Sequence, residues 1–216
     1  VIVFIFFIRI FLSPLPPIVD SHIPQETIDF FKGLVNSDFR INFNPNPNPD
    51  DWDKYESHGM DSLSDEYFIV YYPKADDWKS KAEDILEYGK KSVPELDRFM
   101  QGYPVPEKVN GRKVPVYLAE SDEQFSDLAY EIGNCSASGA VGLFIFEYSY
   151  YGFKPLGILI SDDVYESEPE LPDGMSYAEN VFRHELNHYV YFYHFKFSTL
   201  KEPSLWFTEG LAEYFG

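Results

Sequence analysis

Cysteine, basic residues and long apolar runs are all scarce in this chain. The single cysteine, Cys135, excludes a disulfide within the chain, and we expect its thiol to fill a small buried space. Only 17 lysines and arginines stand against 36 acidic residues, and the formal charge of −19 argues against nucleic acid or an anionic membrane surface as a partner. Residues 1–12 are strongly apolar, but they are too few to cross a bilayer, which takes roughly 20.

The first 64 residues have the composition of a leader followed by a linker. Residues 1–12 have the length of the apolar part of a signal peptide, although no A-x-A-like cleavage site follows them. We therefore expect residues 1–20 to be a signal peptide or an uncleaved membrane anchor, and the protein to be secreted or extracytoplasmic. The Asn-Pro repeat at residues 44–49 supports neither helix nor central strand, so residues 21–64 are predicted to be a flexible linker. Residues 65–216 are predicted to form the folded domain.

Histidine is also scarce, yet two of the five histidines form a His-Glu-x-x-His pentapeptide at residues 184–188. Positions i and i+4 of a helix lie about one turn apart on the same face, so His184 and His188 can bind one ion. Glu185 is rotated by about 100° and lies beside that ion. This arrangement suits Zn²⁺ and a water that the carboxylate deprotonates, which makes Glu185 the predicted general base.

The residues around the pentapeptide favour a helix. Ser176 and Glu179 have the spacing of a capping box, which starts a helix about two turns before His184. No glycine or proline occurs from Tyr177 to Phe197, so the pentapeptide is predicted to lie in the middle of this helix. Random placement of five histidines and 36 acidic residues gives about 0.02 such pentapeptides in 216 positions, so coincidence is uncommon.

Two residues compete to be the third ligand, and His194 is the weaker candidate. It has the spacing of the longer H-E-x-x-H-x-x-G-x-x-H pattern, in which a glycine ends the helix so that the last histidine can turn back to the metal. This chain has Tyr191 at the glycine position, and no methionine follows His188 to form the Met-turn of that class. On a continuous helix His194 would lie nearly two turns away from the ion, so it is interpreted as an ordinary helix-face histidine.

Glu209 is the stronger candidate. The Pro-Ser pair at residues 203–204 is typical of a helix start, and in that helix Glu209 and Glu213 lie at i and i+4 on one face. Glu209 is therefore a candidate metal ligand, and Glu213 is a candidate to hold the ring N–H of His184 or His188. Both could instead be solvent-facing glutamates, but neighbouring apolar residues indicate a helix packed into a core.

The pentapeptide, followed by Trp-x-x-Glu-Gly-x-Ala-x-Tyr at residues 206–214, resembles the gluzincins and the broader peptidase MA-like group of zinc metallopeptidases. The resemblance implies a zincin-like α+β fold, in which a mixed β-sheet packs on the metal-binding helix and a short helix follows with the third ligand. It also implies that zinc is bound by His184, His188 and Glu209, with Glu185 as the base. In such folds the edge strand above the metal helix pairs with an extended substrate peptide, so the resemblance implies this role for one of the segments 137–148 and 156–161. The alternative is that these segments form a purely structural hairpin.

Two features depart from that family. The aminopeptidase branch carries a G-x-M-E-N motif before the metal helix, and its absence here argues against a dedicated aminopeptidase. Gluzincins usually stabilise the oxyanion with a tyrosine or histidine well after the third ligand, whereas this sequence ends seven residues beyond Glu209. We therefore expect one of three cases. A downstream portion is missing, the protein is an inefficient peptidase, or a tyrosine such as Tyr148, Tyr150 or Tyr151 takes that role.

The remainder of the domain is predicted to contain strands at residues 67–72 and 113–119, helices at 76–100 and 121–130, and two adjacent strands or a hairpin at 137–148 and 156–161. Pro94 is expected to kink or break its helix. Pro115 favours an edge position for its strand. Ser121 and Gln124 have the spacing of a second capping box.

Together these features predict a zinc peptidase that hydrolyses a peptide or protein substrate with metal-activated water. Glu185 would take a proton from the water and pass it to the leaving amine. Two alternatives stay open: a zinc-stabilised surface module that binds without catalysis, and a metzincin-like protease that uses His194. A purely structural site needs no base and normally closes with a fourth protein ligand, so the presence of Glu185 favours the enzyme.

Overall fold

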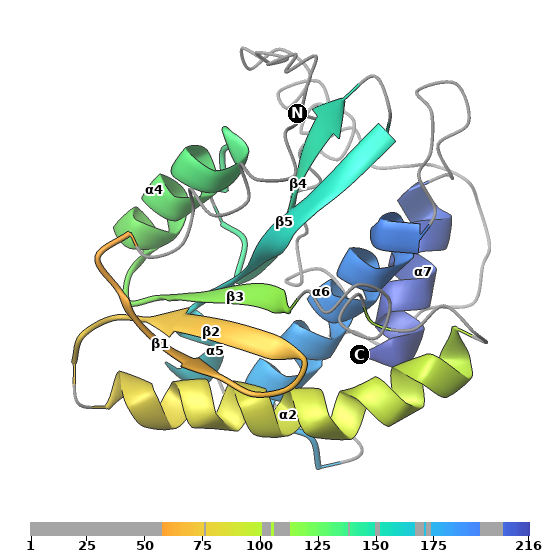
Figure 1. The fold of residues 1–216 in the computed structure, drawn as a ribbon, viewed down its shortest axis with the longest axis horizontal. Helices are drawn as coiled ribbons and strands as arrows, with labels where there is room; N and C mark the ends of the chain where they lie inside the picture. The colour runs from red at the N-terminus through yellow and green to blue at the C-terminus, as the bar shows by residue number, and fades with distance from the viewer. Residues whose placement is uncertain are drawn as a thin grey trace, which may run out of the picture.

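The computed structural model describes residues 58–75, 77–100, 105, 113–137, 139–149, 152–166, 171, 174–194 and 205–216. Within these ranges the protein is an α+β fold with a mixed five-stranded sheet (Figure 1). The predicted leader at residues 1–20 and the Asn-Pro repeat of the predicted linker lie outside the described residues. None of the described helices is long and apolar enough to cross a membrane.

The sheet has the strand order β1-β2-β3-β5-β4. Its strands are β1 (Asp61–Ser64), β2 (Phe68–Tyr72), β3 (Val114–Ala119), β4 (Gly142–Ser149) and β5 (Gly152–Ser161). β2, β3 and β5 are parallel, whereas β1 and β4 run antiparallel to their neighbours at the two edges. The predicted strands at 67–72 and 113–119 and the predicted adjacent pair are confirmed.

Two expectations about the sheet were wrong. Pro115 favoured an edge strand, but β3 lies between β2 and β5. Because the ladder with β5 starts only at Val116, the missing N–H of Pro115 does not interrupt it. The predicted linker ran to residue 64, but Asp61–Ser64 pair with β2. This short, mostly exposed strand contains one apolar residue, which is too little to signal a strand.

The described helices are α2 (Trp78–Phe99), α4 (Asp122–Gly133), α5 (Asp163–Glu166), α6 (Tyr177–His194) and α7 (Leu205–Phe215). Both predicted caps form: Ser121 Oγ accepts the Gln124 N–H at 3.2 Å, and Ser176 Oγ accepts the Glu179 N–H at 3.1 Å. α2 continues through Pro94 as a single helix, so a break at this proline was the wrong expectation. α7 confirms the second helix, although its predicted start at residues 203–204 lies outside the described residues.

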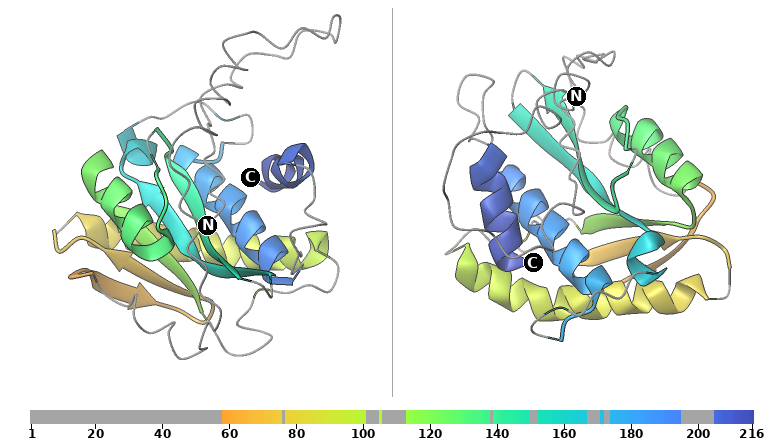
Figure 2. Two further views of the ribbon diagram at one scale, coloured as in Figure 1. Left: turned by 90° about the horizontal axis from the view of Figure 1, so that it is seen from above. Right: turned by 180° about the vertical axis from the view of Figure 1, so that it is seen from behind.

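The sheet separates two apolar cores. α4 packs on one face of the sheet, and α2 and α6 pack on the other (Figure 2). Alternate residues of each strand enter different cores: Val116 and Leu118 pack with α2 and α6, while Tyr117 and Ala119 pack with α4. Cys135 is buried on the α4 side, as expected of a small filler. α6, which carries the pentapeptide, therefore lies between the sheet and α7.

Candidate metal centre

The middle of α6 buries polar side chains that would ordinarily face water. α6 packs against β4 and β5, and four of its polar side chains are at most 3% exposed: His184, Glu185, Asn187 and His188. Ionisable side chains are rarely buried to this extent without partners, because removal from water is costly. This stretch of α6 therefore needs neighbours that compensate for burial, and α7 supplies one of them.

Three side chains from the two helices meet at one point. His184 Nε2 and His188 Nε2 are 3.1 Å apart. The carboxylate oxygens of Glu209 lie 3.2 Å from His188 Nε2 and 3.5 Å from His184 Nε2. Ligand atoms at about 2.05 Å from a tetrahedral zinc ion would be separated by about 3.3 Å. These three residues thus form a group that could hold a metal ion, as the sequence predicted.

The charges of this group are mutually stabilising. Burial by itself would lower the pKa of His184, but the hydrogen bond with Glu209 and the carboxylates of Glu185 and Glu213 outweigh it and raise that pKa. Burial would raise the pKa of Glu209, but its hydrogen bonds with His184 and His188 outweigh this effect and lower it. Glu209 is therefore an ionised carboxylate directed at two ring nitrogens, which is a donor set that suits a divalent cation.

Glu185 lies beside this group in a different environment. It is fully buried, and neither carboxylate oxygen has a well-formed hydrogen bond with any residue that the structure describes. Burial raises its pKa and Glu209 adds to the rise, while the two imidazoles and the backbone N–H of Phe144 act in the opposite direction. A buried carboxylate with so little hydrogen bonding is costly, and such groups are concentrated at functional sites.

Glu213 is placed next to His184 rather than His188. Its Oε1 is 3.6 Å from His184 Nδ1, the ring nitrogen that does not face Glu209. This distance is an ion-pair contact and is longer than a hydrogen bond. The side chain of Glu213 is 68% exposed, so its influence on His184 is screened by water. Of the two histidines that Glu213 was predicted to support, the structure therefore places it next to His184.

The other candidates do not join the group. α6 runs unbroken through Tyr191 to His194, and His194 is not among the side chains that the described structure brings together for a metal. A straight helix places it about 9 Å beyond His188 along the axis. Tyr150 and Tyr151 and the side chain of Tyr148 lie outside the described residues, so the oxyanion-stabilising residue stays untested.

Two kinds of supporting residue were missed at the sequence level. Phe144 and Phe192 pack beside the His188 ring, with centroid separations of 6.4 and 6.5 Å. Gly142, at the start of β4, has no side chain, and a Cβ there would stand 3.1 Å from Glu185 Oε1. A glycine in a strand often marks close approach of another segment, and this was the signal in the sequence that pointed to Gly142.

Comparison with known protein families, curated proteins and solved structures finds no match for this chain. Its function is therefore inferred from the arrangement of these side chains and from the chemistry that they allow.

Proposed function

We propose that this protein is a zinc-dependent peptidase with a zincin-like domain of the gluzincin type. The observation that carries the proposal is the convergence of His184 and His188 from α6 with Glu209 from α7, next to the fully buried carboxylate of Glu185. Acidic and histidine side chains that meet by chance usually do so on the surface, whereas both histidines here are almost completely buried. Burial in a group of this geometry favours a dedicated ion site.

Zinc is the ion that fits the donor set best. Two imidazole nitrogens and one carboxylate are a frequent ligand set of catalytic zinc, and three protein ligands leave one position open. When bound, zinc supplies a Lewis acid and lowers the pKa of a water molecule. A structural zinc site would normally be closed by a fourth protein ligand. The group at His184, His188 and Glu209 contains three among the described residues.

Glu185 has the properties of a proton carrier. As general base it would accept a proton from the attacking water, and as general acid it would return this proton to the amine of the leaving half. A carboxylate at its ordinary pKa is a weak base near neutral pH, so burial that raises the pKa brings it closer to the working range. His184 and His188 contribute by fixing the ion beside this carboxylate.

The edge strand β4 is the part of the fold that would receive the substrate. β5 is paired on both sides, by β3 and β4, whereas β4 has only one partner in the described sheet. β4 also packs on α6, and a Cβ on its first residue, Gly142, would stand only 3.1 Å from Glu185 Oε1. An extended peptide that pairs with the free edge of β4 would run past the proposed catalytic group. With the apolar residues 1–12 ahead of the domain, we place this activity outside the cytoplasm.

The direct test is cleavage of a peptide mixture by the zinc-loaded full chain, with products identified by mass spectrometry. Wild type should produce new termini, a zinc chelator should abolish them, and added zinc should restore them. Glu185→Gln should bind zinc as wild type does but lose at least 100-fold in rate, since general bases contribute about 10² to 10⁴. Zinc binding without any cleavage would favour the surface binding module instead.

A further inference from the structure

The alignment of α7 determines whether Glu209 reaches the two histidines. Glu209 is in the first half of this 11-residue helix, and its last residue, Phe215, lies about 9 Å further along the axis. α7 packs along α6, so a small rotation or shift of α7 would move the carboxylate away from the ring nitrogens. A contact that fixes the far end of α7 would therefore act on the metal site from a distance.

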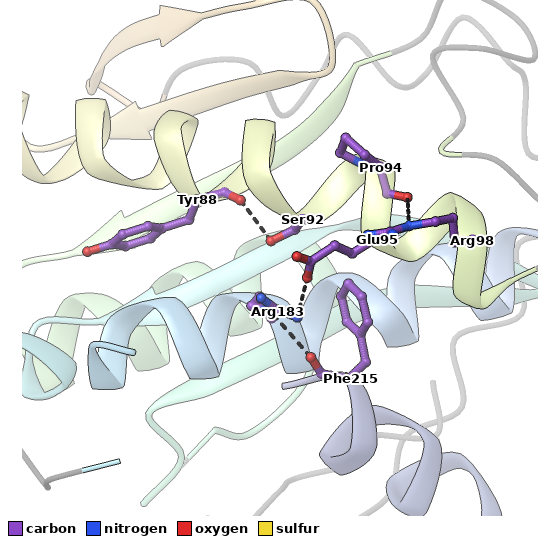
Figure 3. A network of polar contacts seen from close by, with 7 residues as sticks. All are labelled: Tyr88, Ser92, Pro94, Glu95, Arg98, Arg183 and Phe215. Carbon is purple, nitrogen blue, oxygen red and sulfur yellow. Dashed lines mark hydrogen bonds and ion pairs between the residues drawn. The ribbon is translucent and has the colours of Figure 1, made fainter. Parts of the chain in front are cut away.

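Arg183 makes this contact. It immediately precedes His184 on α6, and its Nε donates a hydrogen bond to the backbone carbonyl of Phe215 at 3.1 Å. Its Nη2 donates to Glu95 Oε2 of α2 at 2.8 Å. The guanidinium carbon also lies 4.8 Å from the centroid of the Phe215 ring. Figure 3 shows Arg183 between Glu95 and Phe215, so that one side chain joins three helices.

The chemistry of a helix end explains why an arginine is effective here. The last carbonyls of a helix have no partner within it, and the C-terminal end carries a partial negative charge. A guanidinium neutralises this charge and, as a rigid fork, can bond Phe215 and Glu95 together. The Arg183 side chain is only 13% exposed, so these charge-assisted bonds are largely sheltered from water.

The end of α7 is also in direct contact with α6 near the first histidine. A Cβ on Gly216 would stand 3.3 Å from the Cβ of His184 and 3.1 Å from the carbonyl oxygen of Asn180. There is thus little space between the two backbones at this point. The bond from Arg183 holds α7 at the position where this close approach is made.

We propose that Arg183 is a positioning residue for the metal ligand Glu209, acting through the C-terminal end of α7. The inference rests on the metal site proposed above. Arg183 does not touch the ion or the substrate. It sets the direction of α7, and through it the distance from the Glu209 carboxylate to His184 and His188.

The first test is the zinc dissociation constant of the full chain, measured by competition with a chromophoric chelator. Arg183→Ala should raise this constant by roughly 10- to 100-fold, the range found when a residue that supports a metal ligand is removed. Arg183→Lys should give an intermediate value, because one ammonium cannot reproduce the fork. Arg98→Ala is the matched control, since Arg98 is exposed and its Nε donates to the carbonyl of Pro94 in its own helix. This variant should bind zinc as wild type does. A wild-type constant in Arg183→Ala would overturn the proposal.

A double-mutant comparison separates positioning from general loosening of the fold. If Arg183 acts through Glu209, then Arg183→Ala should have almost no further effect on zinc affinity in a Glu209→Ala background. An equal loss of affinity in both backgrounds would mean that Arg183 supports the histidines or the fold as a whole, and would contradict the proposal.

A third measurement needs no metal. Amide hydrogen exchange of the zinc-free protein should be faster in α7 of Arg183→Ala than in wild type, with α4 unchanged as an internal reference. If wild type binds no zinc, the proposed function fails, and this exchange experiment still decides whether Arg183 fixes α7. Unchanged protection of α7 would show that it does not.

Discussion

Gly142 on β4 lies so close to Glu185 on α6 that there is no room for a side chain at position 142. A Cβ at position 142 would stand 3.1 Å from Glu185 Oε1 and 3.2 Å from its Cγ, and it would overlap Cγ1 of Val181. The absence of a side chain thus brings the edge strand against the proposed base. This close approach joins the two parts of the site, the strand that would receive the peptide and the carboxylate that would move the proton.

Gly142→Ala should therefore lower kcat while zinc remains bound. The added methyl group must displace Val181 or the Glu185 carboxylate, and misplacement of a reacting group by about 1 Å can cost up to 100-fold in rate. We expect a loss of at least 10-fold in kcat, measured on any peptide that wild type cleaves, with unchanged zinc content.

Gly133→Ala is the matched control for this substitution. A Cβ at Gly133 would overlap Cγ2 of Ile145, in the core on the opposite face of the sheet. Both variants should lose about 1–3 kcal/mol of stability from overpacking, but only Gly142→Ala should lose kcat. Equal losses of kcat would mean that the effect comes from the fold and not from Glu185.

The identity of the third ligand predicts a contrast between two variants. Glu209 oxygens lie within 3.5 Å of both Nε2 atoms, while His194 stands apart at the end of α6. Elemental analysis should find one equivalent of zinc in wild type and in His194→Ala, and much less in Glu209→Ala. Loss of zinc in His194→Ala, with retention in Glu209→Ala, would instead support the metzincin-like arrangement.

The parts of the site that sequence could predict are those set by one helix. The spacing of His184 and His188 fixes their common face whatever the fold, and the cap at Ser176 fixes where that helix begins. Glu209 was predictable because its own helix carries a recognisable pattern of residues. How α6 and α7 pack cannot be worked out from either helix by itself. The resemblance of both motifs to the gluzincins nevertheless predicted that Glu209 would lie beside the two histidines.

The missed features depend on packing. Arg183 bonds Phe215, 32 positions away, and Gly142 leaves no room for a side chain beside Glu185, across the interface of a strand and a helix. A glycine within a strand signals that another segment comes close, but no local pattern says which residue that is. β3 was misplaced for a related reason: Pro115 has a local preference for edges, but the starting point of the ladder with β5 decides whether the preference applies.

Cys135 predicts a loss of stability at alkaline pH. Burial raises the pKa of its thiol from 9.0 to about 12, and its Sγ donates to the carbonyl of Ala129 at 3.1 Å. Below pH 9 the thiol is protonated in both the folded and the unfolded state. Between pH 9 and 12 the unfolded state releases the proton first, so stability falls as pH rises. The thiol should account for about 2 kcal/mol of the loss at pH 10.5.

The measurement is the free energy of unfolding by urea at pH 8 and pH 10.5, in wild type and Cys135→Ala. Other titrating groups contribute equally to both proteins, so the smaller decrease in Cys135→Ala isolates the thiol. An identical decrease in the two proteins would show that the thiol ionises as readily in the folded state as in the unfolded one.

Pairing of the substrate with β4 predicts a dependence on the backbone of the peptide. β4 is an edge of the described sheet and is joined to β5 on one side only, so its other side can bond an extended peptide. N-methylation of a substrate amide removes one donor without changing any side chain. Successive N-methyl substitutions along one cleaved peptide should lower kcat/KM at every second position, because alternate amides of an extended chain point to the same neighbour.

Each lost hydrogen bond between the peptide and β4 should lower kcat/KM about 3- to 10-fold, in line with a net hydrogen bond of about 1 kcal/mol. A uniform effect along the peptide, or none outside the cleaved bond, would mean that side-chain contacts and not the edge of β4 hold the substrate.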